Sequence, residues 1–178
     1  MYGGTFGQVS PTGCCGGIYA GATSRINVSG GSIDGLSLSG MAPGVGGSRI
    51  DFSGGTVQNY RRQVASVANG TLNINGGTVR STSGQSGVVG NQGSIINVTG
   101  GQVQSDAGAG IVVSGDSTFT LTGGTVTALS AAGSGVVVSN LSGSAAQLRG
   151  GTRTTVCRPR ATCRARLPCR PRSAAASR

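Results

Sequence analysis

The sequence predicts an all-β protein: a right-handed parallel β-helix (a solenoid) of about five to six rungs, followed by a disordered basic C-terminal tail. Two observations predict this fold. A Gly-Gly phrase recurs every 22–27 residues, and the residues before each pair alternate between apolar and polar. The chain also contains no Glu and no Lys, so its composition does not favour helices. Repeats of this length are typical of solenoid proteins.

The Gly-Gly pairs mark the repeat. Full copies of the phrase occupy 26–33, 50–57, 72–79, 96–103 and 119–126, and weaker copies lie at 2–6 and 146–153. A glycine pair inside strand-like sequence predicts a corner where the chain changes sheet. Such a corner needs a positive φ or a close backbone approach that a Cβ would obstruct.

The residues before each pair predict a strand with one buried face. Counting back from the first glycine, the fourth and second positions are apolar in all five full copies: Ile26, Ile50, Leu72, Ile96 and Phe119, then Val28, Phe52, Ile74, Val98 and Leu121. The residue between them is polar in every copy: Asn27, Asp51, Asn73, Asn97 and Thr120. This period of two is that of a half-buried strand. The polar column can hydrogen-bond along the stack.

Two further apolar columns predict two more strands in each repeat. One follows the glycines at Ile33, Val57, Val79, Val103 and Val126, and one lies eight residues before the first column at Ile18, Val64, Val88 and Ile111. Coiling the chain places these columns in ladders about 4.8 Å apart, so that each rung covers the next. The alternative is a disordered Gly/Ser-rich chain, which 35 glycines and 3% aromatic residues would favour. Disorder gives no reason for columns that stay in phase.

Charge divides the chain into a repeat domain at 1–152 and a tail at 153–178. The repeat domain has six Arg and four Asp, whereas the tail has eight Arg and no acidic residue. The tail has three interpretations: a solvated terminus, an out-of-frame product of GC-rich DNA, or a cationic arm that binds nucleic acid or another anionic surface. It has no aromatic residues for base stacking. We do not expect nucleic acid as a partner.

Catalytic chemistry is scarce in this sequence. His, Glu and Lys are absent, and the acidic residues are Asp34, Asp51, Asp106 and Asp116. Asp51 lies in the polar column, and we expect the other three in loops of different rungs, so a carboxylate pair of the glycosidase kind is not expected. Calcium-binding repeats would need an aspartate in every turn. We expect no enzyme, no catalytic, cofactor-binding or metal-binding residues, and no small-molecule substrate.

The five cysteines do not predict a metal site or a disulfide framework. Cys14 and Cys15 are adjacent, which strains a bond between them, and Cys157, Cys163 and Cys169 follow one another at steps of six. The spacing is not that of a zinc site, and no His is present to complete one.

The N-terminal sequence lacks the features of a targeting segment. Residues 1–25 lack a basic start followed by an apolar run, so we expect no secretory signal peptide. No apolar stretch is long enough to predict a transmembrane helix. The phrase at 3–6 already matches the middle of a repeat, and we expect the chain to begin inside a longer array.

The phrase x-[IL]-N-[VI]-x-G-G-[ST]-[VI], with G-[IV]-V-V strands and loops of Ser, Gly, Ala and Gln, resembles the passenger domains of Gram-negative autotransporters, particularly pertactin-like adhesins with a pectin-lyase-like parallel β-helix. The resemblance covers residues 3–152. It implies a secreted, virulence-type adhesin at the cell outer membrane, whose loops contact a host cell surface or extracellular matrix, with no catalytic residues to carry over. The chain departs from the family's pattern: we expect no signal peptide and no C-terminal translocator barrel in it, and it has no Arg-Gly-Asp triplet, so the resemblance implies a fragment.

The sequence therefore predicts a non-catalytic adhesin stalk that presents loops such as 58–63, which contains adjacent arginines. One alternative is a polysaccharide-acting β-helix enzyme, which would require carboxylates such as Asp34 and Asp51 to converge. The other is binding of nucleic acid or an anionic surface through the basic tail.

Overall fold

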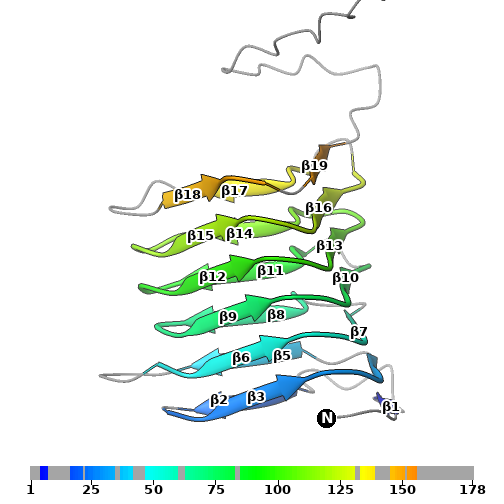
Figure 1. Ribbon diagram of the computed structural model, residues 1–178, viewed down its shortest axis with the longest axis vertical. Helices are drawn as coiled ribbons and strands as arrows, with labels where there is room; N and C mark the ends of the chain where they lie inside the picture. Colours follow the sequence, from blue (N-terminus) through cyan, green and yellow to red (C-terminus); the bar gives the residue numbers. More distant parts are fainter. Residues whose placement is uncertain are drawn as a thin grey trace, which may run out of the picture.

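The computed structural model of the chain is an all-β stack (Figure 1), as the sequence predicts. The structure describes residues 5–7, 17–21, 23–34, 37–41, 47–59, 63–82, 85–130, 133–138, 145–150 and 152–155. Every element assigned within these ranges is a strand. Within the same ranges, no helix is long and apolar enough to cross a membrane.

The strands form three parallel sheets. Sheet A contains β1 (Thr5–Gly7), β4 (Ser32–Asp34), β7 (Thr56–Asn59), β10 (Thr78–Ser81), β13 (Gln102–Ser105), β16 (Thr125–Ala128) and β19 (Thr152–Thr155). Sheet B contains β2 (Gly17–Gly21), β5 (Ser37–Met41), β8 (Ala65–Ala68), β11 (Val88–Asn91), β14 (Ile111–Val113) and β17 (Val136–Val138). Sheet C contains β3 (Arg25–Val28), β6 (Arg49–Phe52), β9 (Thr71–Ile74), β12 (Ile95–Val98), β15 (Thr118–Leu121) and β18 (Ala145–Leu148).

Successive strands pass from sheet B to C to A, and each strand pairs with the equivalent strand one repeat away. The result is a β-solenoid whose rungs lie one above another, with β2 and β3 at one end and β17, β18 and β19 at the other (Figure 1). The prediction of a parallel β-helix is confirmed. Its right-handed sense stays a prediction.

The interior is filled by the predicted apolar columns. In sheet A, Val57, Val79, Val103 and Val126 are paired in register, and each is at most 2% exposed. Sheet C contributes the columns through Ile50 and Phe52, and sheet B the column through Val88 and Ile111. Because an isolated strand cannot cover its own apolar face, burial depends on the rungs above and below.

One predicted column is shifted by a residue. Ala65, not Val64, is the register partner of Val88. β9 begins six residues after β8 begins, whereas β12 begins seven residues after β11, so the shorter link displaces the column. Val64 is still fully buried, and the backbone N–H groups of Val64 and Ala65 both donate to the carbonyl of Gly87.

In the pairs at 54–55, 76–77, 100–101 and 123–124, both glycines lie close to the backbone of the preceding rung, and the second also has a positive φ. The second has a positive φ of 73–82° in all five full copies: Gly31, Gly55, Gly77, Gly101 and Gly124. The first lies against the rung before it. A Cβ on Gly54 would lie 2.6 Å from the carbonyl oxygen of Ser29, and one on Gly76 would lie 2.5 Å from that of Ser53. The sequence predicted either a positive φ or a close backbone approach at the corner, and the structure has both.

The sheet continues past the boundary placed at residue 152. β19 pairs with β16 through Thr155, and Arg153 takes the register position opposite Val126. The remainder of the basic tail, 156–178, lies outside the described residues.

Candidate functional site

A ladder of polar side chains runs along the outer face of sheet C. Asn27, Asp51, Asn73 and Asn97 are register partners on successive rungs. The side-chain amide of Asn97 donates to Oδ1 of Asn73 over 2.9 Å, and the amide of Asn73 donates to Oδ1 of Asp51 over 2.8 Å. The spacing between rungs brings side-chain amides at the same position on neighbouring rungs within hydrogen-bonding distance of each other. Hydrogen bonding along this column, which the sequence allowed, is present from Asp51 to Asn97.

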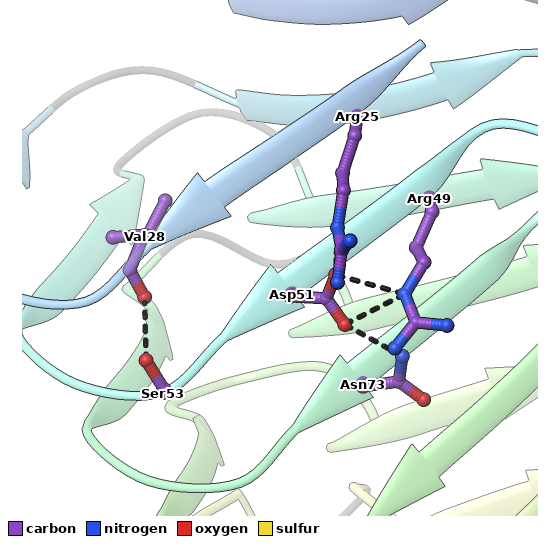
Figure 2. A network of polar contacts seen from close by, with 6 residues as sticks. All are labelled: Arg25, Val28, Arg49, Asp51, Ser53 and Asn73. Carbon is purple, nitrogen blue, oxygen red and sulfur yellow. Dashed lines mark hydrogen bonds and ion pairs between the residues drawn. The ribbon is translucent and has the colours of Figure 1, made fainter. Parts of the chain in front are cut away.

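Two arginines join this ladder at Asp51, as Figure 2 shows. Arg25 and Arg49 are the first residues of β3 and β6 and are paired in register. Nε of Arg25 donates to Oδ2 of Asp51 over 2.6 Å, and Nε of Arg49 donates to both carboxylate oxygens over 2.8 and 2.9 Å. We call Arg25, Arg49, Asp51 and Asn73 the arginine cluster.

Arg25 and Arg49 were not among the residues predicted to form a site, although each lies two positions before the polar column. An available signal was the Arg-Ile dipeptide at 25–26 and again at 49–50, at the same place in consecutive repeats. Strands in register place two such arginines on neighbouring rungs, on the same face as Asp51.

The carboxyl group of Asp51 has a pKa well below the ordinary Asp value. Its partial burial opposes the charged form and would raise its pKa, but hydrogen bonds from Arg49, Asn73 and Arg25 outweigh this and lower the pKa to about 2. The same pairing raises the pKa of Arg49. The carboxylate therefore stays charged throughout the neutral and mildly acidic range.

This pairing predicts an acid dependence of stability. A pKa that is lower in the folded state stabilises the fold above the ordinary Asp pKa, and the contribution disappears as the pH falls towards 2. Since both arginines are about half exposed, we expect the contribution to be about 1 kcal/mol. The free energy of unfolding, measured with urea at pH 7, 4 and 2, should fall less with decreasing pH for Asp51→Asn than for the wild type. An equal loss in both proteins would contradict this assignment.

A second ion pair lies on sheet A. Nη2 of Arg80 donates to Oδ2 of Asp106 over 2.9 Å, and the side-chain amide of Gln104 donates to Oδ1 of Asp106, also over 2.9 Å. The hydrogen bond from Arg80 is the main cause of a lowered pKa at Asp106, against the opposing effect of partial burial. Asp106 directly follows β13, so its predicted loop position is confirmed.

The remaining acids lie elsewhere. Asp116 is in the loop between β14 and β15, as expected, with a φ of 60°. The loop position predicted for Asp34 is wrong: Asp34 is the last residue of β4 and pairs with Gln58, because the strand that leaves the glycine corner continues for three residues. Asp34 and Asp51 lie on different sheets and do not converge.

Several sequence predictions fall on residues outside the described ranges. These are the adjacent arginines of loop 58–63, which lie within 60–62, and all five cysteines. In the part of the chain that is described, no group of three or more His, Cys, Asp or Glu side chains could hold a metal ion.

No family model matches the chain, and searches of curated proteins and of solved structures gave no match. The resemblance to autotransporter passengers therefore depends on the repeat phrase alone. The fold is assigned from the stacked sheets, and a β-solenoid is found in more than one protein family.

Proposed function

We propose that the chain is a non-catalytic, rigid stalk of the surface-displayed adhesin type, which presents side chains and loops from the outer faces of its sheets. The observation that carries this proposal is the continuous core from β6 to β16, in which each rung is covered on both sides. Backbone ladders in all three sheets fix the outward side chains at regular intervals. A surface whose side chains are preorganised in this way loses little conformational entropy when a partner binds.

The repeat phrase supports placing the protein outside the cell. Its resemblance to autotransporter passengers favours display at the outer-membrane surface or secretion, with a host cell surface or extracellular matrix as the partner. The polar ladder of sheet C is compatible with a face that meets water and a partner.

The placement of the carboxylates favours display over polysaccharide cleavage. Asp51 and Asp106 are each held by arginine, and Asp34 lies on a different sheet from Asp51. Glycoside hydrolysis ordinarily uses two carboxyl groups that flank one bond. The aspartates in the described ranges do not provide such a pair.

The proposal is tested by measuring binding and turnover on the same surfaces. The full purified chain is applied to immobilised matrix proteins, cell-surface glycans and fixed epithelial cells, and it is also incubated with soluble acidic polysaccharides. We expect saturable binding to at least one surface and no release of new reducing ends, with the heat-unfolded chain as the control. Release of reducing ends by the native chain alone, or binding that unfolding leaves unchanged, would contradict the proposal.

A further inference from the structure

We propose that Arg25 and Arg49 form an oxyanion clamp on the outer face of sheet C, and that the clamp binds sulfate groups of a sulfated polysaccharide. This inference rests on the proposed display function and deepens it by naming a class of ligand. It is carried by the position, the exposure and the unused hydrogen-bond donors of the two guanidinium groups.

The fold places the two arginines side by side. They are register partners on neighbouring strands, so their Cα atoms lie about 4.8 Å apart. Both side chains extend to the same carboxylate (Figure 2), and Asp51 holds each of them at Nε. A guanidinium fixed at Nε keeps its plane and its direction, which reduces the entropy lost when a ligand binds.

Among the residues that the structure describes, nothing occupies the ends of the two guanidinium groups. None of the hydrogen bonds found among the described residues uses Nη1 or Nη2 of Arg25 or Arg49. The two side chains are 54% and 51% exposed, whereas that of Asp51 is only 15% exposed. The arginines therefore direct unused N–H donors to solvent and cover the acid that orients them.

The charges of the cluster favour an anion. Two guanidinium groups face one carboxylate, which leaves a net charge of +1. The oxygens of Asp51 already accept hydrogen bonds from Arg25, Arg49 and Asn73. The Nη donors of two neighbouring arginines match the several oxygens of a sulfate group, and such charge-assisted bonds are stronger than neutral ones.

The surroundings favour a sugar polymer over a nucleic acid. The outward residues of sheet C on the two rungs after Arg49 are Thr71, Asn73 and Asn97, whose hydroxyl and amide groups can hydrogen-bond to sugar hydroxyls, and the exposed Ile95. No aromatic side chain occupies an outward position in β3, β6, β9, β12 or β15, so base stacking has no platform there.

The test compares equal losses of charge at two places. Binding of a sulfated hexasaccharide to the full chain is measured by calorimetry for the wild type, for the double variant R25Q/R49Q and for the tail variant R158Q/R160Q. We expect the first double variant to weaken binding about tenfold, and the tail variant, which loses the same charge, to weaken it by less than about twofold. Equal weakening in both variants, or none in R25Q/R49Q, would overturn the clamp.

Asp51→Asn separates a clamp from general attraction. This substitution raises the net charge by one, so long-range attraction alone would strengthen binding. The clamp predicts weaker binding, because the arginines lose the carboxylate that holds them. Circular dichroism and thermal unfolding establish that each variant is folded. Stronger binding by folded Asp51→Asn would overturn the proposal.

Two further arms identify the ligand and separate this inference from the display function. Single-stranded DNA of matched charge should bind without sensitivity to R25Q/R49Q, and equal sensitivity would overturn the choice of a polysaccharide. A chain that adheres to a surface in the binding panel but not to the hexasaccharide would contradict the clamp alone. Failure on every surface would contradict the display function as well.

Discussion

Replacing Ile96 with alanine should lower the free energy of unfolding by about 3 kcal/mol, whereas the same replacement at Ile95 should lower it by less than about 1 kcal/mol. The two residues are adjacent and identical, but Ile96 is fully buried and Ile95 is 45% exposed. Urea unfolding followed by circular dichroism measures both variants against the wild type.

The difference arises from the packing of the sheet C column. Ile96 lies in register between Leu72 and Phe119, and its Cδ1 atom would lie 2.6 Å from a Cβ placed on Gly90 of β11. Truncating it opens a cavity between three rungs that backbone ladders hold at fixed spacing. Equal effects at the two positions would mean that the inward and outward faces of β12 are assigned wrongly.

Gly101→Ala should also destabilise the fold by about 3 kcal/mol, through two separate causes. Its φ of 73° is unfavourable for alanine, and an added Cβ would lie 2.6 Å from the carbonyl carbon of Gly76 and 2.7 Å from the carbonyl oxygen of Gly77. Backbone atoms cannot move aside without disturbing the neighbouring rung. Chemical unfolding measures the change.

Gly93→Ala is the matched control. Gly93 has a φ of 76°, but the nearest atom to an added Cβ is Oδ1 of Asn69 at 3.8 Å, an ordinary contact. It should therefore show only the conformational cost, about 1 kcal/mol. If the two alanine variants are equally destabilised, close stacking of the glycine corners does not contribute to stability.

The fold could be predicted in detail because each rung repeats the same local rules. Alternation at Ile96, Asn97 and Val98 assigns the faces of a strand, and a glycine pair after it places a corner. What repetition cannot supply is the length of each link. The link after β8 is shorter than its equivalents, which placed Ala65 where the sequence suggested Val64.

The candidate site was less predictable than the fold. The polar column was visible in the sequence, and Asp51 was assigned to it correctly. Arg49 lies two residues before Asp51 on the same strand, so this pair was within reach of the sequence pattern. The part played by Arg25 depends on which residues of different rungs lie opposite each other, and on a side chain long enough to reach a carboxylate on the next rung. Arg25 and Asp51 are 26 residues apart in the sequence, and only the register brings them together.

The separation of Ser29 and Thr122 is the distance we would measure first. Both residues are exposed and directly follow sheet C strands four rungs apart, and spin labels can be attached there in a chain whose five cysteines are replaced by serine. A solenoid predicts a narrow distribution of distances, with a backbone separation of about 19 Å. A disordered Gly/Ser-rich chain of the same 93-residue separation would give a broad distribution near about 50 Å. That second result would contradict the stacked fold and the stalk proposed from it.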